Sequence, residues 1–282
     1  MKKPIRIAFA MTKGGAGKTT SAAAFATELA AQGNRVLLVD TDTQALVRHA
    51  LGADDAVYGL YNLADGVPFQ DVVYRFTDHP GDRPPRPNLD VIVSTGNLHK
   101  LSLAWTLTEA DREGQFADLM EEVEEEVEYD YILVDTSPTE GMININVFFY
   151  VHHILVPVVV SPFHIFGLRD FIEVIERTKK RKAKRRDSEL DIRWVLPTRF
   201  NRRIRTNAML LEEITEIAGE QLPGATLLNA IPQCARTEEC ALKGESILEY
   251  DRRSRGGLAY TKAVMEVSNY AGRKDRRLAK TN

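Results

Sequence analysis

The chain has 282 residues, of which 44% are apolar and 27% charged, and it contains only two cysteines. That composition excludes a disordered chain, a collagen-like fibre and a small domain held together by disulfides. The formal net charge is −3, but residues 1–150 carry 12 Lys or Arg against 23 Asp or Glu, whereas residues 151–282 carry 25 against 17. Such asymmetry is typical of a protein that presents one basic surface to a polyanion.

Short runs rich in Val, Ile and Leu recur along the chain and predict β-strands. They fall at residues 5–10, 36–40, 89–94, 131–135, 154–160, 192–198 and 225–231. Segments with helical spacing lie between most of them, at residues 21–32, 111–128 and 168–186. This alternation predicts an α/β fold, a mostly parallel, twisted sheet of about seven to eight strands with helices on both faces. Ligands of such sheets bind at the carboxyl ends of the strands.

The first predicted strand leads into a glycine-rich loop, TKGGAGKTT, and then into an Ala-rich helix. Its glycines let successive backbone N–H groups point at phosphate oxygens, and the helix N-terminus adds positive potential. Lys18 is expected to reach the β- and γ-phosphates, and the Thr19 hydroxyl to bind Mg²⁺. This pattern predicts a P-loop nucleotide site. The residues expected to contact the nucleotide are Thr12, Lys13, Gly14, Gly15, Ala16, Gly17, Lys18, Thr19 and Thr20.

Aspartates follow two of the later predicted strands. Asp40 and Asp42 are two residues apart and therefore lie on the same side of an extended chain. Asp135 ends an apolar strand, where a carboxylate suits Mg²⁺ binding through water. Any one of them could instead be a turn residue or a helix cap. Three of them beside a phosphate loop favour a metal–nucleotide site, with Asp135 and Asp40 as candidate metal ligands.

The rest of the chain offers few signs of export or membrane insertion. The apolar stretch after the basic opening is only about seven residues long, so no signal peptide is expected. The apolar residues 143–166 are interrupted by histidines and prolines, which favours a buried strand over a membrane span. Cys234 and Cys240 lack partners at metal-site spacing, which predicts reduced thiols and a cytoplasmic protein. We expect one domain over residues 1–272 and a basic, flexible tail over residues 273–282.

Four segments together resemble the ParA family of partition ATPases, whose phosphate loop is a deviant Walker A motif. They are KGGAGKTT with Lys13, VDTDTQ, ILVDTSP and the late segment beginning IPQCARTEEC, and the resemblance extends from residue 5 to about residue 267. It implies ATP and Mg²⁺ as ligands, a nucleotide-sandwich homodimer that forms with ATP, and hydrolysis stimulated by DNA and a partner. Because the phosphate loop begins at residue 12, we expect no N-terminal helix-turn-helix.

The resemblance also implies roles for individual residues. Lys13 crosses to the ATP of the other subunit, and Asp42 orients the attacking water, so that Lys13, Lys18 and Asp42 form the catalytic set. Asp135 corresponds to the Walker B aspartate. Asn146 falls where the family has an asparagine near the switch segment and is therefore expected to contact the nucleotide. A lysine supplied in trans is consistent with phosphoryl transfer, in which positioning and charge neutralisation dominate.

Arginines in the last third of the chain are candidates for DNA binding. In the family, non-specific DNA binding depends on an Arg before Thr-Asn and on another shortly after Ile-Pro. Arg205 matches the first, with Arg203 as the alternative if the loop aligns differently, and Arg236 matches the second. Arginine–phosphate contacts are independent of sequence, and a dimer would double them. The basic run at residues 179–186 fits a solvated helix terminus equally well.

These features predict an ATPase that binds non-specific double-stranded DNA on the nucleoid and segregates or positions plasmid or chromosomal DNA. Its expected partner is a ParB-like centromere-binding adaptor. Two other classes stay open. A MinD-like membrane ATPase would need an apolar helix face, for which residues 273–282 offer only Leu278 and Ala279, so no membrane partner is expected. A P-loop metabolic enzyme, such as an ATP-dependent ligase, would need an acceptor pocket.

Overall fold

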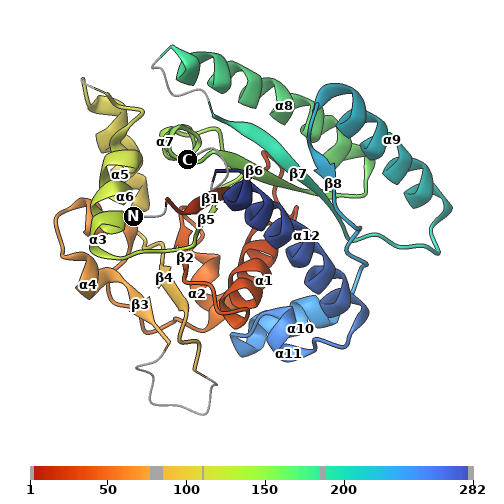
Figure 1. The fold of residues 1–282 in the computed structure, drawn as a ribbon, viewed down its shortest axis with the longest axis horizontal. Coiled ribbons are helices and arrows are strands. Elements are labelled where there is room, and N and C mark those ends of the chain that lie inside the picture. The colour runs from red at the N-terminus through yellow and green to blue at the C-terminus, as the bar shows by residue number, and fades with distance from the viewer. Residues whose placement is uncertain (1–2, 77–84, 110, 185–188, 279–282) are drawn as a thin grey trace.

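The computed structural model describes residues 3–76, 85–109, 111–184 and 189–278. Within these ranges the chain forms one eight-stranded sheet in the order β3-β4-β2-β5-β1-β6-β7-β8 (Figure 1). Every described neighbouring pair is parallel except β3 and β4. The predicted α/β class is confirmed. The strands are β1 Ile5–Phe9, β2 Val36–Asp40, β3 Tyr74–Arg75, β4 Leu89–Ile92, β5 Tyr131–Asp135, β6 His153–Val159, β7 Asp191–Thr198 and β8 Thr226–Leu227.

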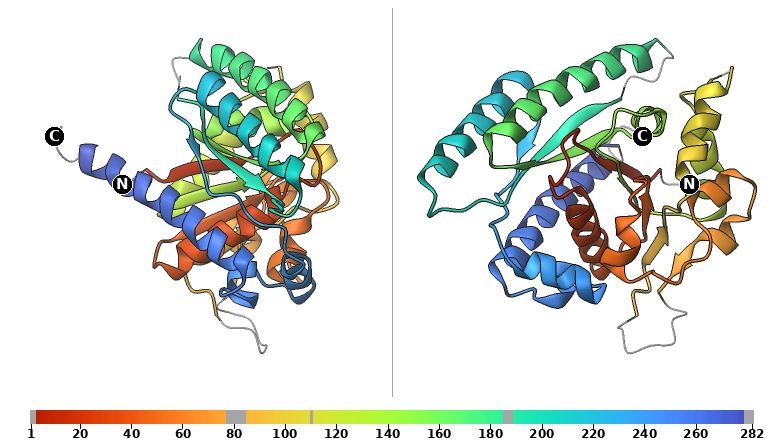
Figure 2. Two further views of the ribbon diagram at one scale, coloured as in Figure 1. Left: turned by 90° about the vertical axis from the view of Figure 1, so that its right-hand side faces the viewer. Right: turned by 180° about the vertical axis from the view of Figure 1, so that it is seen from behind.

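Helices cover both faces of the sheet, and each face has its own apolar core (Figure 2). One face carries α1 Lys18–Ala31, α2 Leu46–Leu51, α10 Arg236–Lys243, α11 Ile247–Tyr250 and α12 Arg255–Leu278. The other carries α3 Leu60–Ala64, α4 Phe69–Val72, α5 Leu98–Leu107, α6 Gln115–Glu126, α7 Met142–Tyr150, α8 Pro162–Ala183 and α9 Arg205–Gln221. The central strands β2 and β5 are buried at every residue, as expected for parallel strands covered on both sides.

Helix α1 lies between the sheet and α12, which explains its run of alanines. Residues 21–30 are all buried, and small side chains let the helix pack closely on both sides. Polar contacts tie it to the later chain, two of them from buried hydroxyls of the helix. Ser21 Oγ lies 3.1 Å from Tyr260 Oη, and Thr27 Oγ1 donates a 2.8 Å hydrogen bond to Ser246 Oγ. The helix that begins at the glycine-rich loop is therefore held firmly in place.

The structure departs from the predicted elements in three places. The predicted strand at 225–231 is reduced to the two residues of β8, although the N–H groups of Leu228 and Ile231 still donate to carbonyls of β7. The apolar residues 143–150 form helix α7 rather than the flank of a strand. Helix α12 continues to Leu278, into the segment where we expected a flexible tail, and residues 279–282 lie outside the described residues.

Because the strands are parallel, the loops after β1, β2, β5, β6 and β7 meet at one edge of the sheet. Helix α8 leaves this edge and ends before β7 begins, so its basic C-terminal run lies at the opposite edge. There Lys182 is buried and donates to the carbonyls of Val151 and Glu189. No helix among the described residues is long and apolar enough to span a bilayer.

Candidate nucleotide-binding site

The glycine-rich loop curls between β1 and α1 with the backbone shape that its sequence predicts. Gly15 and Gly17 have φ angles of +71° and +89°, in the left-handed region that side chains disfavour. No side chain caps the first turn of α1, so its N–H groups remain available to an anion. The hydroxyl of Thr198, at the end of β7, donates a 3.0 Å hydrogen bond to Ala16 O and holds the loop against the sheet.

Lys18 places a buried cation under this loop. Its side chain is 6% exposed, and Nζ donates a 3.3 Å hydrogen bond to Met11 O. Burial lowers the pKa of Lys18, while the carboxyl groups of Asp135 and Asp42 raise it. The Lys18 ammonium group can therefore bind a phosphate in place of one of these contacts.

Thr19 and Asp135 form a pair that suits a magnesium ion. Thr19 Oγ1 donates a 2.6 Å hydrogen bond to Asp135 Oδ2. Asp135 is fully buried, and its Oδ1 has no hydrogen-bond partner among the described residues. Burial raises the pKa of Asp135 to about 7, with Asp42 adding to the rise and Thr19 and Lys18 opposing it. An orphaned buried carboxylate oxygen beside a hydroxyl fits Mg²⁺ held with water and phosphate.

Asp40, the second candidate metal ligand, shapes the loop that follows β2. Its Oδ1 accepts the N–H of Asp42 at 2.9 Å, and its Oδ2 accepts the N–H of Val47 at 3.2 Å. Burial, followed by the neighbouring Asp135, raises the pKa of Asp40 well above its usual range. Both oxygens thus help to shape the loop after β2, and a metal contact of Asp40 stays a prediction.

Asp42 lies in that loop at the edge of the site. Its side chain is 6% exposed, and its Oδ1 accepts the N–H of Gln44 at 3.0 Å. The preceding Thr41 donates both its N–H and its hydroxyl to Asp135 O, at 2.9 and 2.8 Å. These bonds join the loops after β2 and β5, so Asp42 is brought close to Lys18 and Asp135, whose pKa values it raises.

Asn146 is not brought to the phosphate loop. It is fully buried in α7, where its Oδ1 accepts the N–H of Phe116 at 3.0 Å. Its Nδ2 donates to Arg112 O at 2.8 Å and to Met142 O at 3.1 Å. The amide thus anchors the start of α6 to α7. The expectation of a nucleotide contact is not supported by this geometry.

Asn144, which was not among the predicted site residues, is the asparagine that contacts the segment after β5. Its Nδ2 donates to Ser137 O at 2.9 Å and to Thr139 O at 2.7 Å. Residues two apart on a helix point in different directions, so only one of the two asparagines can meet this segment. The position of Asn144, three residues after Gly141 at the start of the helix, is the signal that could have identified it.

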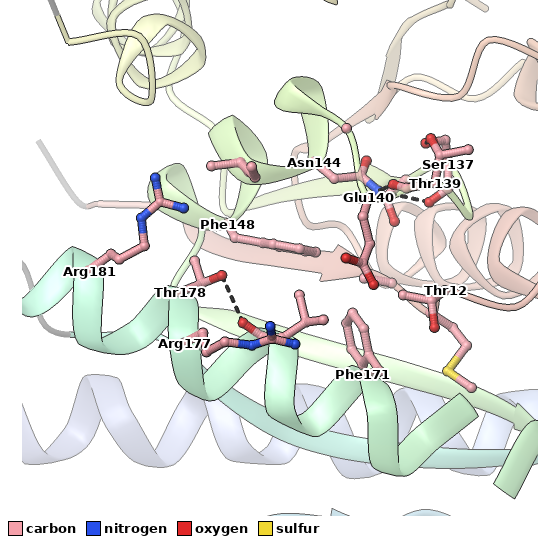
Figure 3. A pocket seen from close by; sticks show the side chains of 16 residues that line it. Thr12, Ser137, Thr139, Glu140, Asn144, Phe148, Phe171, Arg177, Thr178 and Arg181 are labelled. Carbon is pink, nitrogen blue, oxygen red and sulfur yellow. Dashed lines mark hydrogen bonds between the residues drawn. The ribbon is translucent and has the colours of Figure 1, made fainter. Parts of the chain in front are cut away.

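A cavity of about 200 Å³ lies beside the site, between residues 136–141, α7 and α8. Figure 3 shows Thr12, Glu140 and Asn144 toward one end of it, and Thr178 and Arg181 toward the other. Phe148 and Phe171 lie edge to face in its lining, with ring centroids 6.1 Å apart. The segment after β5 therefore has open space beside it.

Lys13 is exposed, unlike Lys18, and packs outside the loop. Its aliphatic stem crosses Gly167 of α8 so closely that a Cβ atom there would lie 2.5 Å from Lys13 Cγ. Two large apolar side chains of the same helix are exposed nearby in the chain, Phe163 at 78% and Phe166 at 59%. The lysine that we expected to act in trans is thus on the surface, beside an apolar patch.

The three arginines expected to bind DNA are exposed and lie on two neighbouring loops. Arg203 and Arg205 follow β7, and Arg236 begins α10 after β8. The two loops are joined by a bridge between Phe200 and Pro232 and by a hydrogen bond between Asn201 and Gln233.

Their surroundings differ. Arg236 lies 3.8 Å from a carboxylate oxygen of Glu239 and 3.7 Å from one of Asp251. By contrast, the motif around Arg205 is fixed by the buried Asn207, whose Oδ1 accepts the N–H of Asn201 at 2.9 Å. The loop after β7 is therefore held in place while its arginines point to the surface.

Comparisons with known proteins agree with this geometry. The AAA domain family model matches residues 5–190. Over 268 residues the chain is 30% identical to the chromosome partitioning protein ParA of Caulobacter vibrioides, covering 94% of each chain. It is 29% identical over 267 residues to the sporulation initiation inhibitor protein Soj of Bacillus subtilis, covering 93% of this chain and 97% of Soj.

Solved structures share the fold. Cobyrinic acid a,c-diamide synthase from Mycobacterium smegmatis, with ADP and magnesium, superposes with a TM-score of 0.75 at 21% identity over 95% of each chain. A putative plasmid partition protein from Borrelia burgdorferi bound to AMPPNP gives 0.73 at 22% identity, over 95% of this chain and 99% of that one. From the matched domain, and from the similarity to ParA over nearly its whole length, the chain belongs to the ParA family of P-loop partition ATPases.

Proposed function

We propose that the protein is a Mg²⁺-dependent ATPase that dimerises on ATP, binds double-stranded DNA without sequence preference, and segregates or positions plasmid or chromosomal DNA. It would act with a ParB-like centromere-binding partner, in the cytoplasm and on the nucleoid. The observation that carries the proposal is the pair of Thr19 and Asp135 beneath a left-handed glycine loop, with one carboxylate oxygen left without a partner among the described residues.

The residues of the site divide the work of hydrolysis. The Thr19 hydroxyl and, through water, Asp135 would hold Mg²⁺, which would supply charge neutralisation on the phosphates. Lys18 and the first N–H groups of α1 bind the phosphate oxygens. Asp42, on the loop tied to Asp135 by Thr41, is in a position to orient the attacking water.

The ATP-dependent dimer is supported by the surface around Lys13. The lysine lies outside its own loop, and the exposed Phe163 and Phe166 provide apolar area to bury in an association. A cation that reaches across to the partner's phosphates would be neutralised only when both nucleotides carry the γ-phosphate. That requirement would make association depend on ATP rather than on ADP.

DNA binding is supported by the exposed arginines of the two joined loops. Arg203 and Arg205 form no ion pair with the described side chains, whereas Arg236 would have to exchange two loose carboxylate contacts for phosphate. A dimer presents two such sets on one particle, so ATP would raise DNA affinity through avidity.

The test is retention of non-specific double-stranded DNA with ATP and with ADP over a series of salt concentrations. We expect retention with ATP only. Removing one arginine–phosphate interaction should reduce the slope of the logarithm of the binding constant against the logarithm of the salt concentration by about 0.9. Replacing Arg205 and Arg236 with alanine should abolish most of the retention. The control replaces Arg35, which precedes β2, and Arg75, which lies on β3. Strand β3 is at the opposite end of the sheet from β8. Equal weakening by both pairs of substitutions would contradict the assigned surface.

A metabolic role is tested by the same preparation. The amide synthase from Mycobacterium smegmatis shares the fold, so an acceptor-dependent reaction is the competing function. ATP hydrolysis that proceeds without any small-molecule acceptor and rises on adding DNA favours the partition function. Hydrolysis that requires an acceptor, and that DNA leaves unchanged, would favour the ligase class instead.

A further inference from the structure

The first turn of α8 holds a histidine against the phosphate loop. His164 Nε2 lies 3.3 Å from Gly14 O, and His164 Nδ1 lies 2.9 Å from Ser161 Oγ. The contact joins residues 150 positions apart, and the side chain is half-buried. None of the roles assigned above uses this histidine.

The two partners determine which ring nitrogen carries the proton. Gly14 O can only accept, so Nε2 must carry the hydrogen that it donates. Nδ1 then has a lone pair and accepts the hydroxyl hydrogen of Ser161. Burial lowers the pKa of His164, and the cations of Arg199, Lys13 and Lys18 lower it further, against the bond to Gly14. The neutral imidazole is therefore held in one orientation.

The Ser161 side chain orients His164 and does not cap α8. It stands at the N-cap of α8, where a serine hydroxyl ordinarily accepts a backbone N–H of the first turn. Here its side chain makes no such bond and donates to the imidazole instead. The usual capping interaction is thus replaced by one that positions a histidine.

The bond to Gly14 also determines the direction of the next N–H group. All described peptide bonds are trans, so the C=O of Gly14 and the N–H of Gly15 point in opposite directions. With the carbonyl held toward α8, the N–H of Gly15 points away from α8, and no carbonyl of the described residues accepts it. It is thus left for an anion in the loop.

We propose that His164 is a positioning residue for nucleotide binding, which acts through the Gly14 carbonyl to hold the Gly15 N–H toward the phosphates of ATP. The inference rests on the proposed ATP site and adds a residue to it. A direct consequence is that His164 connects the phosphate loop to α8, the helix that carries the exposed Phe163 and Phe166.

The experiment compares His164→Leu, His164→Gln and Ser161→Ala with the wild type. Affinity is measured for a fluorescent ATP analogue and, by competition, for ATP and for tripolyphosphate. His164→Leu should weaken the binding of ATP and of tripolyphosphate by the same factor, about tenfold, because the adenine base of ATP does not contact this part of the loop. His164→Gln, whose amide can still donate to Gly14 O, should stay within about twofold of the wild type. Ser161→Ala, which only frees the ring to rotate, should fall between the two.

The controls separate positioning from folding. His99→Leu is matched, since His99 also contacts a glycine carbonyl, Gly96 O at 3.0 Å, but on α5. It should leave both affinities unchanged. The melting temperature without nucleotide should be the same for His164→Leu and His164→Gln. The inference is overturned if His164→Leu binds ATP like the wild type, or if both His164 variants lose affinity and melting temperature together. If the wild type itself does not bind ATP, the proposed function fails and this inference falls with it.

Discussion

Replacing Asp135 with asparagine should abolish ATP hydrolysis and yet stabilise the protein without nucleotide above neutral pH. The carboxyl group is fully buried, one of its oxygens has no partner among the described residues, and its pKa is raised from 3.8 to about 7. A group with a raised pKa stabilises the folded state fully below its unfolded pKa, and this contribution is lost as the pH rises through the folded pKa. The window here runs from about pH 4 to about pH 7.

The magnitude follows from the width of this window. Each pH unit between the two pKa values is worth about 1.4 kcal/mol, so ionising Asp135 costs the folded protein about 4 kcal/mol by pH 8. Asparagine avoids this cost but leaves one buried N–H donor without a partner, a penalty of about 1–3 kcal/mol. The net gain at pH 8 is therefore about 1–3 kcal/mol. The asparagine penalty does not change with pH. The free energy of unfolding of the variant, relative to that of the wild type, should therefore rise by about 3 kcal/mol between pH 5 and pH 8.

The assay is urea unfolding followed by circular dichroism, in EDTA and without nucleotide, at several pH values from 5 to 8. Asp65→Asn, an exposed site at the end of α3, is the matched control and should show no such trend. If the free energies of unfolding of Asp135→Asn and the wild type differ by the same amount at every pH, the reasoning is refuted. It is refuted also if the variant becomes less stable relative to the wild type as the pH rises.

Three further outcomes follow from the contacts described. Asn146→Leu should lower the free energy of unfolding by about 2–4 kcal/mol, because it orphans buried backbone groups, while ATP affinity stays close to that of the wild type; urea melts and nucleotide titration decide this. Asn144→Leu should instead lower the hydrolysis rate, measured by phosphate release, since it frees the segment after β5. Gly17→Ala forces a side chain into φ +89° and should cost about 1–2 kcal/mol in urea melts and weaken ATP binding; unchanged values would contradict the strained conformation.

Much of the fold could be predicted because its signals are local. Parallel strands buried on both faces are continuous apolar runs, and six of the seven predicted runs match strands to within two residues at each end. The loop and its helix follow from glycine conformation and helix electrostatics, which depend on neighbouring residues alone. Helix α7 was missed because Ile, Val and Phe favour strands, and here burial between β1 and α8 overrides that preference.

The roles of polar residues were harder to predict because they depend on contacts between distant segments. Asp40 and Asp42 look alike in the sequence, but only the folded loop shows that both oxygens of Asp40 are occupied by backbone N–H groups. Asn146 was expected at the nucleotide from its position in a motif, but its side chain bonds to Phe116, whereas Asn144 bonds to the segment after β5. The contact of His164 with Gly14 spans 150 residues, and no local pattern marks it.

The central claim is that Lys13 of one protomer completes the site of the other, and mixing two inactive variants tests it most directly. Lys13→Ala keeps its own site but donates no lysine, whereas Asp42→Ala donates Lys13 but cannot orient water. When the two are mixed before ATP is added, each heterodimer has one complete site of two and should hydrolyse ATP at about half the rate of a wild-type dimer. No recovery above the separate variants, in a mixture shown to contain heterodimers, would contradict the account.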